Sequence, residues 1–174
     1  MSRFKAYAIA ALAGVFVSCA AAQAQPQTSR LTNDIQVSGQ IQPDDIAALK
    51  SQGIKTVIDM RPDGEEPGQP AAAAVAQAAR QAGLQFAYIP VPASGDVPPS
   101  AVDALWQQMS RSPRPILLYC RSGNRAVRTW ALAEAARPGG LDAAAITRHA
   151  KDAGRPVDDL QEQIAQRIAA RGVK

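Results

Sequence analysis

A cysteine, two arginines and a glycine stand close together between Tyr119 and Ala126, in the stretch YCRSGNRA. This stretch follows an apolar run, PILL, and precedes a helical pattern, VRTWALAEAA, so we expect a turn between a buried strand and a helix. Such a turn aims backbone N–H groups at one point, and the following helix adds the positive end of its dipole. The turn is therefore predicted to bind an anion.

The side chains of this turn suit the same task. Gly123 permits backbone angles that other residues resist, Ser122 can donate a hydroxyl hydrogen bond, and Arg125 can direct two N–H groups at an oxyanion. The same donors stabilise a thiolate, which predicts that Cys120 is a nucleophile near neutral pH. Arg121 either reaches a ligand at the rim or faces solvent. The predicted anion-binding residues are Arg61, Arg121, Ser122, Gly123, Asn124, Arg125 and Ala126.

The cysteine and histidine content narrows the chemistry. The chain has two cysteines, Cys19 and Cys120, and one histidine, His149. An exported protein normally pairs its cysteines, so a lone Cys120 is a buried filler, an intermolecular bridge or a reactive thiol. The arginines beside it favour the reactive thiol. A Cys-His protease would depend on His149 alone, and a His-rich metal site is excluded. We expect no metal and no cofactor.

The N-terminal segment 1–24 has the layout of a secretory signal. Two basic residues precede an apolar run from Ala6 to Val17, and small residues around Ala24 offer a cleavage site. The run is too short to span a membrane comfortably, so we expect no transmembrane segment after processing. We expect cleavage after Ala24 and a periplasmic or secreted protein. The sequence FVSC leaves a lipoprotein anchored through Cys19 as an alternative.

The charge balance argues against nucleic acid as a partner. The formal net charge of the whole chain is +4, and cleavage after Ala24 removes two basic residues and lowers it to about +2. The sequence has no run of Lys or Arg and no basic stripe with interleaved aromatic residues, which is the usual footprint of nucleic-acid binding. No feature of the sequence identifies a protein partner.

Strand and helix patterns alternate along the rest of the chain. Residues 25–33 are polar and are predicted to be a linker, and residues 34–172 are predicted to form a single domain. The third helix would begin with a capping box made by Ser100 and Asp103. The alternation predicts an α/β fold with a parallel or mixed central sheet covered by helices, followed by C-terminal helices. Strand patterns cover 35–39, 55–60, 84–91 and 115–119, and helix patterns cover 43–53, 71–83, 100–111, 127–136, 142–154 and 157–172.

Two long loops should lie beside the cysteine turn. The segments RPDGEEPGQP and PASGDVPP each follow a predicted strand, as the turn does. Ligands of such sheets bind outside the carboxyl ends of the strands, so we expect all three segments on one rim. Arg61, in the first loop, would either add positive charge to the pocket or pair with Glu65 or Glu66 and shape the loop.

The turn and its surroundings also resemble known families. CRSGNR resembles the active-site loop of rhodanese-type sulfurtransferases, in which four residues separate the cysteine from the arginine; tyrosine and dual-specificity phosphatases have five. Three segments, VSGQIQPDDIAALKSQGIKTVIDMRPDGEEPGQP, AYIPVPASG and LLYCRSGNRA, resemble the bacterial beta-lactamase hydrolase-like, phosphatase-like domain family. The resemblance runs from about Val37 to Gly154. It implies a tyrosine-phosphatase-like fold that carries a rhodanese-length loop.

Two residues depart from the phosphatase pattern. Tyr119 stands where phosphatases usually have a histidine, and Ala126 replaces the serine or threonine that commonly follows the arginine. These departures and the shorter loop favour sulfur transfer as the first hypothesis. A Cys120 persulfide would form from a small anionic donor, thiosulfate or a persulfide, and pass its sulfur to a thiol acceptor or cyanide.

Two alternatives stay open. The first is a cysteine phosphatase with a phosphocysteine intermediate, in which the resemblance places Asp96, 24 positions before Cys120, as the general acid. Asp96 is otherwise a turn residue after Gly95. The second alternative is a non-catalytic module that binds an anion or a partner through the same loop.

Overall fold

The computed structural model describes residues 26–171, which form a five-stranded sheet covered by helices. The N-terminal segment with its predicted signal, cleavage site and lipidated cysteine lies outside these residues. The strands are β1 (Thr28–Arg30), β2 (Ile35–Ser38), β3 (Thr56–Asp59), β4 (Gln85–Tyr88) and β5 (Ile116–Tyr119). The helices are α1 (Asp45–Ser51), α2 (Ala72–Ala82), α3 (Pro99–Arg111), α4 (Asn124–Ala136), α5 (Ala143–Asp152) and α6 (Gln161–Ala170), with a 3₁₀ turn, η1 (Asp158–Leu160), before the last.

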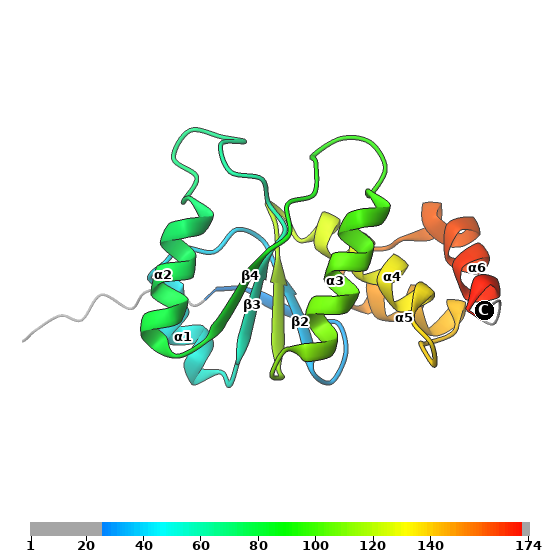
Figure 1. Ribbon diagram of the computed structural model, residues 1–174, viewed down its shortest axis with the longest axis horizontal. Helices are drawn as coiled ribbons and strands as arrows, with labels where there is room; N and C mark the ends of the chain where they lie inside the picture. Colours follow the sequence, from blue (N-terminus) through cyan, green and yellow to red (C-terminus); the bar gives the residue numbers. More distant parts are fainter. Residues whose placement is uncertain (1–25, 172–174) are drawn as a thin grey trace, which may run out of the picture.

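The sheet is mixed, with β5 at its centre. The strand order is β1-β2-β5-β3-β4, and all neighbouring pairs are parallel except β1 with β2. Parallel strands need crossover connections, and the helices that follow β2, β3 and β4 supply them (Figure 1). The α/β class predicted from the alternating pattern is confirmed.

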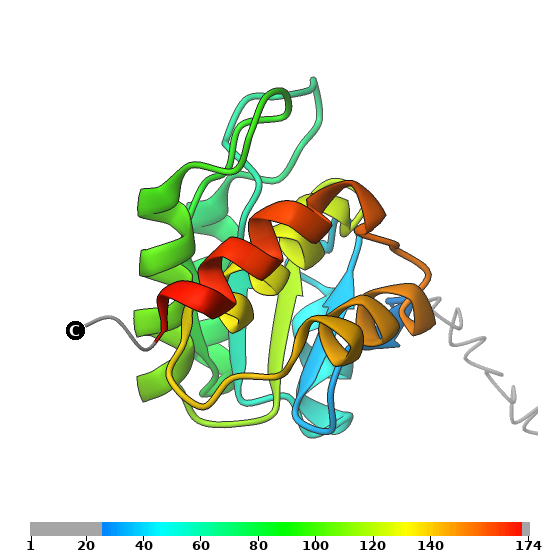
Figure 2. The same ribbon diagram turned by 90° about the vertical axis from the view of Figure 1, so that its right-hand side faces the viewer.

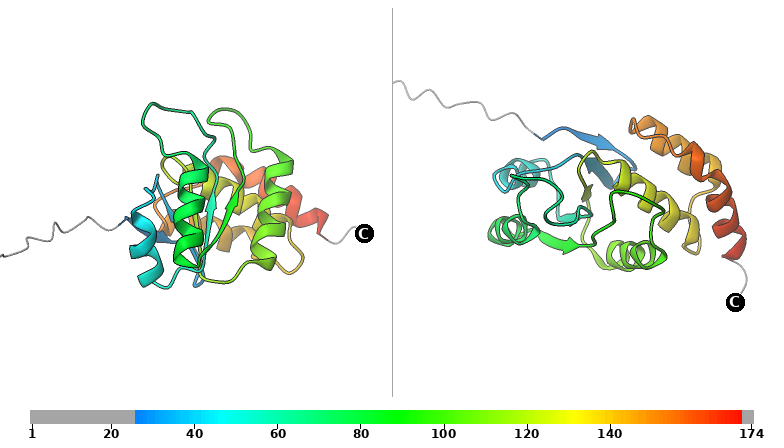
Figure 3. Two further views of the ribbon diagram at one scale, coloured as in Figure 1. Left: turned by 60° about the vertical axis from the view of Figure 1, so that its left-hand side comes forward. Right: turned by 90° about the horizontal axis from the view of Figure 1, so that it is seen from above.

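Helices cover both faces of the sheet. The apolar residues of α1 and α2 pack with Leu117 and Tyr119 on one face, and those of α3 and α4 pack with Ile116 and Leu118 on the other. The whole of β5 is buried, as the unbroken apolar run predicts for a strand with helices on both sides. The helices α5 and α6 pack on the outer side of α4 (Figures 2 and 3). Within residues 26–171 no helix has the length and apolarity needed to cross a bilayer.

The structure corrects three predictions made from the sequence. Residues 28–33 are not a linker, because β1 pairs antiparallel with β2 and Leu31 is buried in the core. The capping box is absent, because α3 begins at Pro99 and Ser100 therefore lies inside its first turn, where no side-chain cap forms. The pattern over 157–172 is not one helix, since η1 precedes α6.

Candidate active site

The nucleophile turn, residues 120–123, joins the carboxyl end of β5 to α4. Cys120 is only 1% exposed, and its Sγ accepts a hydrogen bond from the Gly123 backbone N–H at 3.1 Å. Gly123 is the N-cap of α4 and has φ of +91°, a left-handed conformation that side-chain-bearing residues rarely adopt. The sulfur therefore sits at the positive end of a 13-residue helix with a donor already aimed at it.

The Arg121 carbonyl in the turn has a hydrogen-bond donor of its own. The Gln40 backbone N–H donates to the Arg121 carbonyl at 3.1 Å. A side chain at the preceding residue, Gly39, would place its Cβ 3.2 Å from the same carbonyl, so this contact requires glycine or some movement. Because peptide units are planar and trans, fixing a carbonyl on one side directs the N–H of the same unit to the opposite side.

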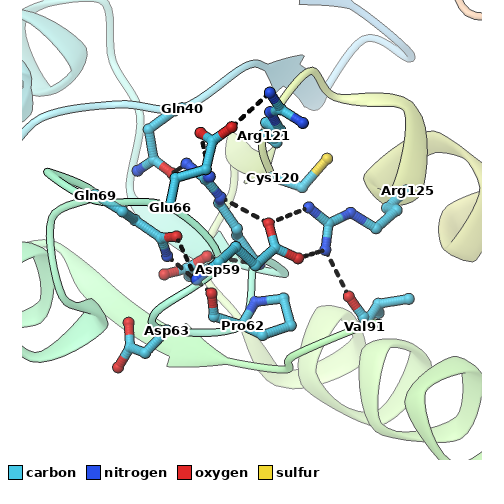
Figure 4. A network of polar contacts seen from close by, with 12 residues as sticks. Gln40, Asp59, Pro62, Asp63, Glu66, Gln69, Val91, Cys120, Arg121 and Arg125 are labelled. Atoms are coloured by element: carbon cyan, nitrogen blue, oxygen red, sulfur yellow. Dashed lines mark hydrogen bonds and ion pairs between the residues drawn. The ribbon is translucent and has the colours of Figure 1, made fainter. Parts of the chain in front are cut away.

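Arg125, in the first turn of α4, is held by a carboxylate and a carbonyl (Figure 4). Its NH1 and NH2 groups donate to the two oxygens of Glu65 at 2.6 and 2.8 Å, and NH1 also donates to the Val91 carbonyl at 2.7 Å. Burial alone would lower the pKa of Arg125, but Glu65 and the Cys120 sulfur raise it above its ordinary value. The guanidinium is therefore a fixed positive charge beside the cysteine.

Glu65 links Arg61, in the loop after β3, to Arg125, in the first turn of α4. It accepts from Arg125 and, at 2.8 Å, from the Nε of Arg61, whose side chain is only 3% exposed. The hydrogen bonds from Arg125 lower the pKa of Glu65, so the carboxylate is charged at neutral pH. Arg61 also donates to Glu66 and to the Gln40 side chain, each at 2.8 Å. Of the two roles predicted for Arg61, pairing with glutamates is the one observed.

Asp59, at the end of β3, is a buried acid that contacts this network through the backbone of Arg61. Its Oδ1 accepts the Arg61 backbone N–H at 2.8 Å. Burial raises the pKa of Asp59 to about 6, and contacts with Tyr119 and the Arg61 backbone lower it only in part. The buried Tyr119 hydroxyl is close enough to the Asp59 carboxylate to lower its pKa, but it makes no hydrogen bond of normal geometry. Burial and the carboxylate raise the pKa of Tyr119 well above its ordinary value.

The structure places the segments of the predicted rim close to one another. Glu65, in the loop after β3, and Val91, directly before the predicted loop PASGDVPP, both contact Arg125, so both loops approach the end of the nucleophile turn at the start of α4. Arg121 is 65% exposed and pairs with Glu66 at 2.5 Å, which places it on the rim. Ser122 and Asn124 are exposed, whereas Ala126 is buried.

Two candidate residues do not join the network. Asp96 is exposed on the loop before α3, and within residues 26–171 no hydrogen bond or ion pair connects it to the nucleophile turn. His149, on α5, packs edge-on against the ring of Trp130 at 6.4 Å between centroids. No contact with Cys120 supports a Cys-His pair. In the described part of the chain no group of three or more His, Cys, Asp or Glu residues is placed to hold a metal ion.

Sequence reasoning missed three contributors to the site. It assigned Glu65 only as a partner of Arg61, yet this carboxylate also holds Arg125. The sequence did contain a signal for this pairing, because several arginines were expected on one rim and each of them needs a carboxylate as a counterion. Gln40 and Arg155 also contact the site, through Arg61 and through the Ser122 carbonyl. Neither position carries a local motif that marks it.

Comparisons of the sequence with known proteins agree with this arrangement. Residues 28–137 match the family described as beta-lactamase hydrolase-like protein, phosphatase-like domain. The chain is 35% identical to the beta-lactamase hydrolase-like protein of Agrobacterium fabrum over 106 residues, which are 61% of this chain and 24% of that protein. It is 33% identical to the protein of the same name from Xylella fastidiosa over 133 residues, 75% of this chain and 31% of that protein. The chain thus spans less than a third of the length of these relatives.

Comparison with solved structures identifies the fold. A candidate phosphatase from Neisseria meningitidis, nma1982, is 32% identical with a TM-score of 0.69, covering 80% of this chain and 96% of that one. The kinase-associated phosphatase, determined with serine in place of its catalytic-site cysteine, has a TM-score of 0.65 at 14% identity, covering 85% and 98%. At that identity the likeness concerns the fold alone. The chain belongs to the beta-lactamase hydrolase-like protein, phosphatase-like domain family and has a tyrosine-phosphatase-like fold.

Proposed function

We propose that the chain is a cysteine-dependent phosphatase that hydrolyses a phosphate monoester through a phosphocysteine intermediate. The observation that carries this proposal is the Gly123 N–H at 3.1 Å from Cys120 Sγ, with Arg125 fixed in the same first turn of α4. This arrangement supplies a nucleophile, a donor that stabilises its anionic form and a cation for the oxygens of the substrate.

Arg125 retains two donors for a substrate. A guanidinium has five N–H donors, and three are used here, two by Glu65 and one by the Val91 carbonyl. The two that remain, on Nε and NH2, share one edge of the guanidinium. Such an edge binds two oxygens of a phosphoryl group as a fork. Glu65 therefore orients Arg125 and leaves its substrate-binding edge available.

The reaction proceeds in two displacements. The Cys120 thiolate attacks phosphorus, the S–P bond forms, and the bond from phosphorus to the ester oxygen breaks. The leaving oxygen takes the electron pair and is protonated by Asp96 or by water. Water then attacks phosphorus, the S–P bond breaks, and phosphate leaves with Cys120 again a thiolate. Arg125 and the N–H groups of the nucleophile turn stabilise the charge on the phosphoryl oxygens in both steps.

Sulfur transfer is the second candidate function, and two observations favour it. Only four residues separate Cys120 from Arg125, and Asp96 is exposed without a contact to the nucleophile turn. In this reaction the thiolate attacks the outer sulfur of thiosulfate, a S–S bond to Cys120 forms, and sulfite leaves with the electron pair of the broken bond. No general acid is required, because sulfite is a stable anion.

Steady-state assays on one set of proteins distinguish the two functions. The full chain and its Cys120→Ser and Asp96→Asn variants would be given an aryl phosphate, an alkyl phosphate, or thiosulfate with cyanide. We expect release of phosphate that is abolished in Cys120→Ser. In Asp96→Asn we expect a larger loss with the alkyl phosphate, whose leaving group needs protonation more. Thiocyanate formation without phosphate release would reject the phosphatase proposal and support sulfur transfer.

A further inference from the structure

Arg155 reaches the nucleophile turn from outside the part of the chain that defines the family. It lies between α5 and η1, beyond residues 28–137, which match the family. Its Nε donates to the Ser122 carbonyl at 3.0 Å, and its NH1 donates to the Ala153 carbonyl at 2.8 Å. Its backbone N–H is held by the Ala150 carbonyl at 2.9 Å. The end of α5 therefore fixes the arginine at both its backbone and its side chain.

The contact bears directly on the donor that faces the cysteine. The Ser122 carbonyl and the Gly123 N–H belong to one peptide unit, and in a trans unit they point in opposite directions. Arg155 binds the carbonyl, and the N–H donates to Cys120 Sγ at 3.1 Å. Hydrogen bonds in series through one peptide polarise each other, so a cation on the carbonyl strengthens the N–H as a donor.

Gly123 accommodates this arginine as well as the backbone angle. A Cβ at position 123 would lie 2.3 Å from the Nε of Arg155 and 2.8 Å from its Cζ. The guanidinium therefore occupies the space that any side chain at this position would fill. The sequence CRSGNR accordingly meets two demands at its glycine, the left-handed φ and the close approach of Arg155.

We infer that Arg155 is a positioning residue: it fixes the Ser122–Gly123 peptide so that the Gly123 N–H stays directed at the Cys120 sulfur. The inference rests on the proposed role of Cys120 as the nucleophile and is independent of the group that the cysteine transfers. The C-terminal segment thus contributes to the active site, because the connection after α5 carries the arginine that binds the carbonyl side of this peptide.

The test measures the thiolate itself rather than turnover. The full chain would carry Cys19→Ser, so that Cys120 is its only cysteine, and the ultraviolet absorbance of the thiolate would be followed against pH. The absorbance of a Cys120→Ser protein would be subtracted. We expect Arg155→Gln to move the midpoint of this titration upward by about one pH unit, the effect of losing one charge-assisted hydrogen bond. Arg155→Lys, which keeps the charge without the planar fork, should move it upward by less.

Arg128→Gln is the matched control. Arg128 pairs with Asp159 at 2.7 Å and so also ties α4 to the C-terminal segment, but within residues 26–171 no hydrogen bond or ion pair joins its side chain to the nucleophile turn. We expect Arg128→Gln to leave the midpoint unchanged. An equal shift in Arg128→Gln and Arg155→Gln would reject the inference, because general loosening of the C-terminal segment would then explain both.

Salt separates a positioning effect from a long-range charge effect. At about 1 M salt the Debye length is only ~3 Å, so the action of a distant charge is largely screened while a direct hydrogen bond persists. A shift in Arg155→Gln that disappears in high salt would overturn the inference. If Arg155→Gln does not fold, the titration midpoint of Arg155→Lys is measured instead. An unchanged midpoint in Arg155→Lys would also overturn the inference. A protein that transfers neither phosphoryl nor sulfur would still give this titration, so the two proposals fail separately.

Discussion

Replacing Asp59 with asparagine should stabilise the protein at neutral pH and leave its stability unchanged in acid. Burial raises the pKa of Asp59 from 3.8 in the unfolded chain to about 6 in the folded protein. The folded state therefore binds a proton more tightly than the unfolded state, and stability falls as pH rises through this interval. A difference of roughly two pKa units corresponds to about 3 kcal/mol between acid and neutral pH.

Asparagine keeps the contact that the carboxylate makes while removing its charge. Its side-chain oxygen can accept the Arg61 backbone N–H, as Oδ1 does now at 2.8 Å. Its amide can donate to the Tyr119 hydroxyl, which is buried without a hydrogen bond of normal geometry. The substitution should therefore recover most of the cost of burying the charge, and about 3 kcal/mol is its upper limit.

Urea unfolding over a range of pH measures this effect. The fluorescence of Trp130, which is fully buried, reports the transition for the parent chain and for Asp59→Asn. The difference in unfolding free energy should be near zero at about pH 3.5 and rise to at most about 3 kcal/mol near pH 7.5. Because other groups titrate equally in both proteins, the difference isolates Asp59. A difference that stays flat with pH, or a loss of stability at neutral pH, would refute the reasoning.

Three further substitutions test the other parts of the site. Arg125→Lys should lower kcat on an aryl phosphate on the order of 10²-fold, because it removes the forked donor; it should also lower the unfolding free energy, because Arg125 forks onto Glu65. Wild-type kcat would contradict the role given to the arginine. Glu65→Gln should lower the unfolding free energy by about 3 kcal/mol at neutral pH. Since the pKa of Glu65 is lowered, this loss should shrink as pH falls below the unfolded value of 4.5 and vanish only below the lowered folded pKa, opposite in sign to Asp59. Gly123→Ala should cost about 1–3 kcal/mol of stability, because φ is +91° there, and a neutral result would contradict the assigned backbone strain.

The sequence predicted four of the five strands and the nucleophile turn because they depend on local signals. The unbroken apolar run of β5 marked a strand buried on both faces, and CRSGNR immediately after it marked the turn. The rule that parallel strands end at one rim then placed both long loops beside Cys120. Glu65 of the first loop contacts Arg125, and so does Val91, which directly precedes the second.

What the sequence did not predict depends on contacts between distant segments. The edge strand β1 is only three residues long and polar, and it exists because β2 offers it a partner. Arg155 lies in a connection between helices, 30 or more positions from any residue of the nucleophile turn, so no spacing rule identifies it. The pairing of Glu65 with Arg125 spans 60 positions and appears only when the loop after β3 meets the start of α4.

The central claim is that Cys120 forms a covalent phosphoryl intermediate, and rapid-quench mass spectrometry of the intact protein tests it most directly. The full chain with Cys19→Ser would be mixed with an aryl phosphate or with thiosulfate, quenched in acid under non-reducing conditions, and compared with a protein that also carries Cys120→Ser. The account predicts the gain of one phosphoryl group from the aryl phosphate, absent when Cys120 is replaced. Gain of one sulfur atom from thiosulfate, with no phosphoryl adduct, would contradict it.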